Sequence, residues 1–535
     1  MTEQQSTKRM MSRRAILAAG AGSVVTALLA ACGNAVATTT AAVPTVAAVA
    51  TQLAPSVNAA AASVAPTVAA AATVAAPPAP TTAAAITAVT VAATSAAPPV
   101  AAAATVGAAP TVNATATTAA GSATKAPAAV SSTGSTVEIS FFFPSAASGP
   151  IVPTVNGYVD EFNKQNNGVK VTPTYIGGYT DVTTKIQTTI DGGGQPPETA
   201  VLLSTDLYAL KDADYILPFT DYLKGQDAYI NDFYPAFMLN SKDGNDIYGI
   251  PFQRSTPVMY YNKDLFMQVG LNPDQPPQKW ADMVDAAKKL VKPDGSRWGV
   301  EIPSDGFPYW VFQGMTIGNG KNYVDPSGNK VYLNDPVVVQ ALQAWVNLGT
   351  TDKVGPNSIV VWATTPADLI GGKTAIAWHT TGSLTDIVKQ SAGKFQLGVG
   401  YLPGLKGPGA PTGGGNFYLF KKTPKEKQQA AFKFIQYMSS PELEARWTID
   451  SGYVAARKSA WEQPALKDYA AKVPQVTVAR DQLQYADKEF ATHSGPQVQK
   501  VFGDELQAAL TGKKTPQQAM DDAQKNVDNI LKQFR

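Results

Sequence analysis

The stretch VEISFFFP, residues 137–144, begins the part of the chain in which regular secondary structure is predicted. Its run of aromatic and β-branched residues, ended by a proline, predicts a buried β-strand. Strand and helix patterns then alternate as far as residue 204, which indicates a parallel sheet with crossover helices and an α/β fold. The segments are a helix with Ile151, Val155, Tyr158 and Phe162 on one face, the strand VKVTPTY (169–175), a helix near 181–190 and the strand TAVLLS (199–204).

Local signals refine this prediction at three places. Pro173 cannot donate to a strand ladder, so its strand should end there or lie at a sheet edge. Capping boxes are predicted at Thr423 with Glu426 and at Thr515 with Gln518, each followed by an amphipathic helix.

The predicted folded part begins near residue 136 and has about 400 residues, which is too many for one hydrophobic core. We therefore expect at least two lobes. In α/β proteins of this size a ligand site is expected between the lobes, at the carboxyl ends of the strands.

The N-terminal segment predicts export and lipid attachment. A basic start precedes a small, apolar run from Ala15 to Ala31, which is typical of a signal peptide and shorter than a membrane span. SRRAIL (12–17) resembles a twin-arginine export signal, and LAAC (29–32) resembles the lipobox of bacterial lipoproteins. We expect residues 1–31 to be a signal peptide and Cys32, the only cysteine, to be lipidated. The alternative is a chance small residue in a membrane-buried segment.

Residues 32–135 are predicted to form a lipidated, disordered tether. After Cys32 the segment consists mainly of alanine, threonine, valine and proline, with no aromatic residue and with Lys125 as its one charge. Little large apolar surface is available to offset the entropy of ordering, and repeated prolines interrupt helix formation.

Composition argues against several classes of function. The net charge of +2 does not favour nucleic acid, and the two histidines, His379 and His493, have no neighbouring metal-ligand pattern. IGGKTA (370–375) lacks the first glycine of a phosphate loop, because Ala367 stands there. No catalytic constellation is found, so we expect no metal, no cofactor and no enzymatic activity.

The segments PFQRSTPVMYYNKDLF (251–266) and GLNPDQPPQKW (270–280) resemble the extracellular solute-binding proteins of bacterial ABC importers, family 1, of the carbohydrate type. Within this family the likeness is greatest to glycerol-3-phosphate binders. Further matching stretches, such as FQLGVGYLP (395–403) and DSGYVAARKSAW (450–461), spread the resemblance over nearly the whole predicted folded part.

The resemblance implies a two-lobed, type II periplasmic-binding-protein-like fold that closes on its ligand by a hinge. TPVMYYN (256–262) and GGKTAIAWH (371–379) would be strands that cross between lobes. Lobe 1 would contain residues 136–250 plus 384–438, and lobe 2 would contain residues 251–383 plus 439–535.

The resemblance also implies contacts with the ligand, carried over residue by residue. Rings would pack on the C–H faces of a sugar, and hydroxyl and backbone groups would bind its hydroxyls. Trp378 could stack in the cleft or lie in the hinge. The implied residues are Tyr179, Ser255, Phe307, Trp310, Ser383, Gly414 and Tyr453.

Two departures bear on the ligand. Ser204 replaces a glutamate of the family pattern, with Asp206 close by, although Asp206 could simply cap the following helix. The arginine that precedes GPQVQ (495–499) in the pattern is absent, which argues against a phosphate, although Arg254 could supply a cation from elsewhere.

We therefore expect a lipid-anchored, extracytoplasmic, monomeric substrate-binding component of an ABC importer that delivers a sugar or oligosaccharide to a permease with a separate ATPase. Glycerol-3-phosphate or another polyol phosphate is the alternative ligand. A surface-anchored carbohydrate-active enzyme is a third hypothesis, from a different class.

Overall fold

The computed structural model describes residues 136–165 and 168–535. All described residues fall within one compact unit of the chain. The predicted signal peptide, the lipidation site Cys32 and the tether lie outside the described residues. Within the described ranges, every helix is too short or too polar to cross a membrane.

The first sheet has six strands and confirms the predicted strand–helix alternation. β1 runs parallel to β2 and β3, whereas β13 runs antiparallel to β3, β4 and β7. The sheet is therefore mixed, and its antiparallel partner comes from a segment more than 200 residues later in the chain. The strands are β1 (Val137–Pro144), β2 (Val169–Gly177), β3 (Thr199–Leu203), β4 (Ile216–Leu217), β7 (Ile250–Ser255) and β13 (Gly413–Phe420).

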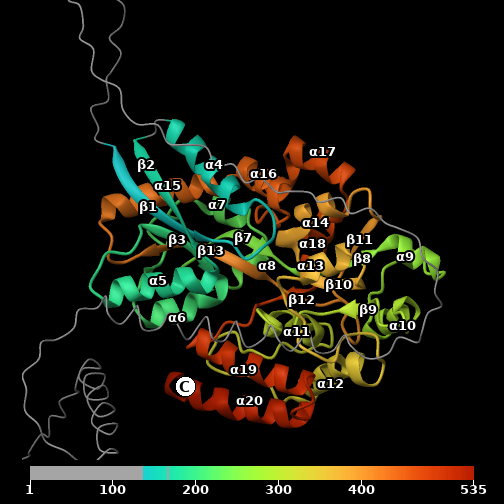
Figure 1. Cartoon of the computed structure of the whole chain (residues 1–535). Coiled ribbons are helices and arrows are strands. Elements are labelled where there is room, and N and C mark those ends of the chain that lie inside the picture. The colour runs from blue at the N-terminus through green and yellow to red at the C-terminus, as the bar shows by residue number, and fades with distance from the viewer. Residues whose placement is uncertain (1–135, 166–167) are drawn as a thin grey trace, which may run out of the picture. The chain divides into compact units, whose positions relative to one another are not determined.

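Helices cover both faces of the first sheet (Figure 1). Phe141 and Phe143 of β1 pack in a core with α4 (Ile151–Lys164) and α15 (Lys425–Met438). Ala200 and Leu202 of β3 face α5 (Tyr179–Asp191) and α6 (Leu207–Asp212). The alternation of side chains along each strand thus divides the apolar residues between two helical layers.

The three local predictions have different outcomes. β2 continues past Pro173 and lies at the end of the sheet order, so the edge position is the correct alternative. The capping box at Thr515 and Gln518 is present. The box at Thr423 is wrong, because the Thr423 hydroxyl donates to the carbonyl of Phe420 and α15 begins at Lys425 without a side-chain cap.

The second sheet has the order β11-β8-β10-β9. Its strands alternate between two cores: Val258 and Tyr260 of β8 pack with the first-sheet core, whereas Met259 and Tyr261 pack with a second core. The second core is formed mainly by α10, α11, α12, α19 and α20. The bounds are β8 (Pro257–Asn262), β9 (Trp298–Glu301), β10 (Thr374–Thr380), β11 (Leu397–Gly400), α10 (Trp280–Leu290), α11 (Pro308–Ile317), α12 (Pro336–Thr350), α19 (Gly495–Leu510) and α20 (Pro516–Leu531).

The remaining elements are short or lie around these cores. They are α7 (Asp227–Asn231), α8 (Pro235–Met238), β5 (Lys242–Asp243), β6 (Asp246–Ile247), α9 (Lys263–Gln268), α13 (Thr365–Ile370), α14 (Leu384–Ser391), β12 (Ala410–Pro411), α16 (Pro441–Ser451), α17 (Pro464–Lys472), α18 (Gln475–Gln482), β14 (Ala486–Asp487) and the 3-10 turns η1 (Ser204–Asp206), η2 (Thr381–Ser383), η3 (Lys458–Glu462), η4 (Leu483–Tyr485) and η5 (Lys532–Phe534).

Three chain segments meet where the two sheets adjoin. Thr256 joins β7 of the first sheet to β8 of the second. The N–H of Thr381, which follows β10, donates to the Thr256 carbonyl at 3.1 Å, and the Thr256 N–H donates to the Thr381 hydroxyl at 3.2 Å. The buried Gln482 amide donates to the Thr256 hydroxyl at 3.0 Å and accepts from the Leu402 N–H at 2.6 Å. These hydrogen bonds connect the two sheets at one junction.

Packing suggests a different lobe division from the one predicted. Leu443, Leu466 and Val476 of α16, α17 and α18 lie in the core of the first sheet, although 439–535 is predicted in lobe 2. β11 pairs with β8 in the second sheet, although 384–438 is predicted in lobe 1. We propose that residues 441–482 belong with the first lobe and that β11 belongs with the crossing sheet.

Candidate functional site

A cavity between the two cores brings together six of the predicted site residues. They come from α5, the end of β7, the start of α11, β13 and the loop after α16, segments that are far apart in the sequence. Its volume is about 40 Å³, room for a few water molecules. We call it the inner cavity. The six residues are Tyr179, Ser255, Phe307, Trp310, Gly414 and Tyr453.

Contacts behind the walls fix the orientation of the rings. The Tyr179 hydroxyl donates to the Gln253 side-chain carbonyl at 2.8 Å. The Trp310 indole N–H donates to the carbonyl of Thr412 at 2.9 Å. Tyr453 stacks on Trp447 with ring centroids 5.4 Å apart. Burial raises the pKa of Tyr453 to about 12, so its hydroxyl remains protonated at neutral pH.

Five further residues line the inner cavity and were not predicted. Trp362 packs edge-on against Phe307, with centroids 5.2 Å apart, and it comes from a loop with no periodicity that could have indicated it. Glu489 comes from the segment just before GPQVQ (495–499), close to where the family pattern has an arginine. The five are Ala146, Leu203, Trp362, Thr380 and Glu489.

A buried polar cluster lies next to the inner cavity. The Ser204 hydroxyl donates to Glu489 at 2.9 Å, and the Thr183 hydroxyl donates to Asp206 at 3.0 Å. Burial raises the pKa of Asp206 to about 7. Burial also raises the pKa of Glu489 to about 8, although the nearby Arg254 cation and the Ser204 hydrogen bond oppose the shift. At neutral pH these carboxyl groups can therefore donate hydrogen bonds as well as accept them.

Arg254 and Ser204 belong to this cluster and do not line the inner cavity. Arg254 is fully buried, and one of its nitrogens donates to the Gly414 carbonyl at 3.3 Å. Its Nε and second terminal nitrogen have no hydrogen-bond partner among the described residues. Burial lowers the pKa of Arg254.

Like Arg254 and Ser204, two further predicted residues, Trp378 and Ser383, line neither cavity. Trp378 is buried in β10, and its ring packs edge-on against Trp280 in the second core with centroids 5.8 Å apart. Trp378 therefore lines neither cavity, and its place in the hinge stays a prediction. Ser383 is buried in η2 and accepts a hydrogen bond from the Ser148 N–H at 3.2 Å.

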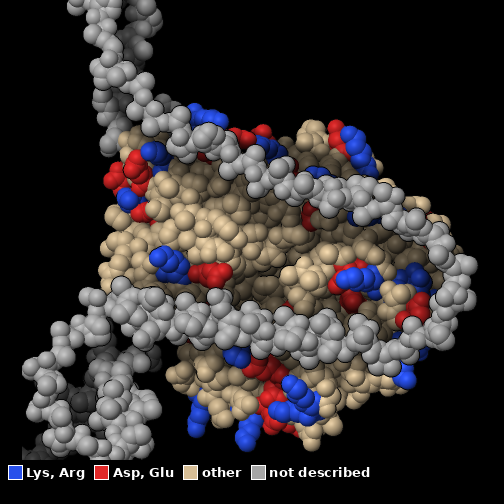
Figure 2. All heavy atoms as spheres, in the orientation of Figure 1, with Lys and Arg blue, Asp and Glu red and all other residues tan. Residues whose placement is uncertain are grey.

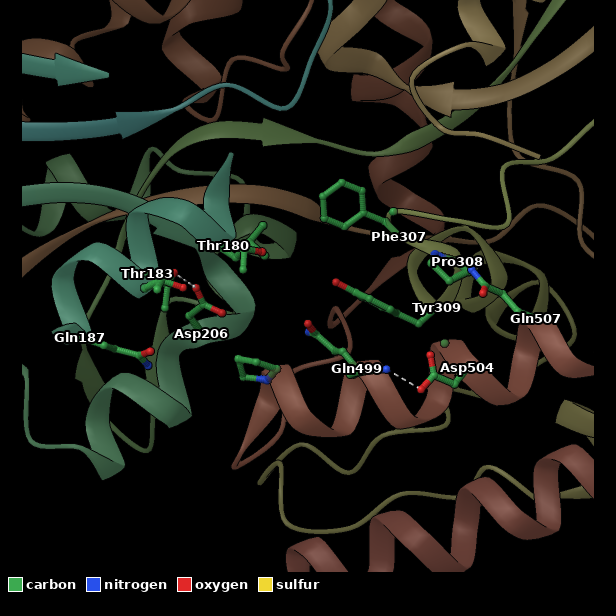
Figure 3. A pocket seen from close by; sticks show the side chains of 16 residues that line it. Thr180, Thr183, Gln187, Asp206, Phe307, Pro308, Tyr309, Gln499, Asp504 and Gln507 are labelled. Carbon is green, nitrogen blue, oxygen red and sulfur yellow. Dashed lines mark hydrogen bonds and ion pairs between the residues drawn. The ribbon is translucent and has the colours of Figure 1, made fainter. Parts of the chain in front are cut away.

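A second, larger cavity adjoins the inner one and has a volume of about 430 Å³. It lies between α5 with η1 on one side and the start of α11 with α19 on the other (Figure 3). Asp206, the remaining predicted site residue, lines it. We call it the outer cavity.

Few cations line these cavities. Across both linings the only lysine or arginine is Lys500, which pairs with Asp504 at 2.7 Å. On the described surface visible in Figure 2, lysine and arginine lie close to aspartate and glutamate in small mixed groups. Neither feature provides the arginine fork or the basic surface that favours an anionic ligand. Among residues 136–165 and 168–535, no group of three His, Cys, Asp or Glu side chains could hold a metal ion.

The chain is similar in sequence to one family of proteins and to individual proteins with known names. The family model of the bacterial extracellular solute-binding proteins matches residues 157–475. The sn-glycerol-3-phosphate-binding periplasmic protein UgpB of Yersinia enterocolitica is 29% identical over 410 residues, covering 72% of this chain and 91% of the relative. UgpB of Escherichia coli K12 is 28% identical over 414 residues, with the same coverage.

Solved structures share the fold. UgpB from Mycobacterium tuberculosis in complex with glycerophosphocholine has a TM-score of 0.67 and 23% identity, and it covers 74% of this chain and 98% of that one. Maltose-bound T. maritima MalE3 has a TM-score of 0.64 and 21% identity, and it covers 74% and 100%. The predicted two-lobed, type II fold is thereby confirmed.

Proposed function

Because this chain belongs to the bacterial extracellular solute-binding proteins, we propose that it is the substrate-binding component of an ABC importer and captures a neutral sugar or oligosaccharide. The observation that carries the proposal is the inner cavity. It combines the rings of Tyr179, Trp310 and Tyr453 with the carboxyl group of Glu489. Aromatic faces suit the C–H face of a sugar ring, and hydroxyl and carboxyl groups suit its hydroxyls.

Capture requires movement between the two cores. The inner cavity of about 40 Å³ is far smaller than usual ligand sites of roughly 300–1,000 Å³. A sugar ring therefore fits only in a form of the protein in which the two cores stand farther apart than they do in this structure. Once bound to both sides, the ligand adds contacts that exist only in the closed state and so shifts the population toward closure.

A polyol phosphate is the second candidate. Two curated relatives are named as sn-glycerol-3-phosphate-binding proteins, and Arg254 has two unpartnered nitrogens. However, Arg254 does not line either cavity, and Lys500 already pairs with Asp504. These contacts favour the neutral ligand.

A thermal-shift screen of the full chain distinguishes the two ligands. A sugar at about 100 times its dissociation constant should stabilise the fold by about 2.7 kcal/mol. We expect such a shift with at least one neutral saccharide and none with sn-glycerol-3-phosphate. The reverse pattern would overturn the proposed ligand and leave the solute-binding function standing.

Recovery of the ligand tests the third hypothesis. A binding component releases its saccharide unchanged, whereas a carbohydrate-active enzyme releases products. We expect chromatography after long incubation with the best-binding saccharide to recover it intact. Product that increases in proportion to protein concentration would contradict the transport role.

We also propose that Cys32 carries a lipid that anchors the protein to the extracytoplasmic side of the cell membrane. Residues 33–135 would be the tether between this lipid and the folded part. Two or three acyl chains bind a membrane stably, whereas one does not. In a bacterial host, Cys32→Ser should abolish labelling by radioactive palmitate and release the protein from the membrane fraction. Unchanged labelling in the variant would refute lipidation at this residue.

A further inference from the structure

We propose that the outer cavity is a second ligand subsite, which holds further units of an oligosaccharide whose first unit lies in the inner cavity. The inference rests on the proposed function and narrows its ligand to a saccharide of at least two units. It depends on the shared boundary of the two cavities, on the chemistry of the outer walls and on their distribution over the two cores.

The two cavities share a boundary. Both are lined by Leu203 and Phe307, so these side chains lie at the boundary that a ligand would pass. In Figure 3 the ring of Phe307 borders the outer cavity, while its packing against Trp362 connects it to the inner aromatic wall. When the cores separate and these two side chains move apart, a chain of sugar units can extend from one cavity into the other.

The outer walls have the chemistry of a polyhydroxylated ligand. The hydroxyl of Tyr309 and the amide of Gln499 point into the cavity, with Asp206 facing them from the opposite side (Figure 3). Asp206 is 4% exposed, and of its two oxygens only Oδ2 accepts the hydrogen bond from Thr183. Hydroxyl, amide and carboxyl groups supply the paired donors and acceptors that sugar hydroxyls need.

Aromatic rings are confined to the boundary. Phe307 and Tyr309 are the only rings that line the outer cavity, and the walls beyond them carry Thr184, Gln187 and Gln507. The inner unit is therefore held largely by ring packing, whereas the outer units are held by hydrogen bonds. The volume of about 430 Å³ lies in the usual range for ligand sites.

The outer cavity also contains groups from both cores. α5 and η1 pack with the first sheet, whereas α11 and α19 belong to the second core. A ligand that fills only the inner cavity leaves most of this surface without contacts. A longer ligand adds bridging contacts and should therefore favour closure more strongly.

The test is isothermal titration of the full chain with a panel of α- and β-linked glucose, galactose and mannose saccharides of one to four units. We expect the best-binding longer saccharide to bind at least about ten-fold more tightly than its monosaccharide. The double variant Gln187→Ala with Gln499→Ala should lose about ten-fold or more in affinity for the longer saccharide and change that for the monosaccharide less than about two-fold.

Two further variants make the result specific. Gln343→Ala with Gln517→Ala, on exposed positions of α12 and α20, is the matched control and should change neither affinity. Thr184→Trp, at an exposed position of the outer wall, should block the longer saccharide and spare the monosaccharide.

The outcomes separate the two proposals. Saccharide binding without any gain from length, or equal losses for short and long saccharides in the double variant, would overturn the second subsite and leave the proposed function intact. No binding of any saccharide in the panel would contradict the proposed ligand, and with it this inference.

Discussion

At the scale of single residues, Glu489 connects the inner cavity to the buried polar cluster beside it. It lines the inner cavity, accepts a hydrogen bond from Ser204 and lies near Arg254. The sequence indicated Ser204, Asp206 and Arg254 separately, but nothing in the chain order indicated that they share one buried cluster with Glu489.

Glu489 should give the protein a distinctive pH dependence of stability. Burial raises its pKa to about 8, so between about pH 5 and pH 8 the folded state retains a proton that the unfolded chain has lost. The free energy of unfolding contributed by this group therefore falls as pH rises across that window. Compared with the native protein, Glu489→Gln should gain stability progressively from pH 5 to pH 8 in thermal melts.

The matched control for this pH effect is Glu138→Gln, since Glu138 is exposed and pairs with Lys170 on the surface. A plot of the melting temperature of Glu138→Gln against pH should run parallel to that of the native protein. If the plot for Glu489→Gln were also parallel to that of the native protein, burial would not raise the pKa of Glu489.

Tyr453 should contribute a hydrogen bond to ligand binding. Its ring position is held by Trp447, so Tyr453→Phe removes only the hydroxyl. With a net hydrogen-bond contribution of about 0.5–1.5 kcal/mol, affinity for the best saccharide should fall about three- to ten-fold while the melting temperature changes little. Titration calorimetry measures the loss, and Tyr485→Phe at a 37% exposed position serves as the control. An unchanged affinity would remove Tyr453 from the site.

At the scale of elements, the glycine run at the start of β13 determines how closely three segments approach. A Cβ on Gly413 would lie 2.3 Å from the Trp310 ring, and a Cβ on Gly414 would lie 1.8 Å from the Gln253 carbonyl oxygen. Gly414 also has φ of +92°, a conformation that other residues rarely adopt. The resemblance assigns Gly414 a contact with the ligand, and the structure gives it a packing role as well.

Gly414→Ala should therefore destabilise the fold by about 2 kcal/mol or more, because it adds both backbone strain and a clash with backbone. Gly407→Ala is the matched control, since a Cβ there meets nothing within 4 Å and its φ is not positive. Urea unfolding of both variants measures the difference. Equal stabilities would mean that β13 can shift away from β7 at little cost.

At the scale of the whole molecule, ligand binding is a property of two cores joined at one junction. The inner cavity takes Tyr179 and Gly414 from the first sheet and its helices, and Trp310 from the second core. Thr256, Thr381 and Gln482 connect these parts through hydrogen bonds that cross between segments. A ligand held by both cores therefore links elements that belong to different cores.

Hydrogen exchange should report this link. On binding the best saccharide, amides in 179–187 and in 307–313 should both exchange more slowly, because the two segments face the same ligand from different cores. Exchange measured by mass spectrometry on the full chain, with and without saccharide, provides the comparison. The internal control is α20, which contributes no residue to either lining. Protection confined to one segment would contradict closure.

The sequence by itself determined the elements of the first sheet. VEISFFFP, the amphipathic helix after it and TAVLLS were predicted correctly, because side-chain periodicity is a local property that burial imposes on each segment. Its motifs also indicated the family, and through it six residues that the fold brings into one cavity.

Only the tertiary structure decided how distant segments meet. It paired β13 with β3, placed α16 to α18 against the first core, packed Trp378 against Trp280 in the second core and added Glu489 and Trp362 to the inner cavity. The physical reason is that such contacts join residues separated by tens to hundreds of positions. Which residues pair is determined by packing and by the need of buried polar groups for hydrogen-bond partners. Neither requirement produces a periodic pattern of residues in the sequence.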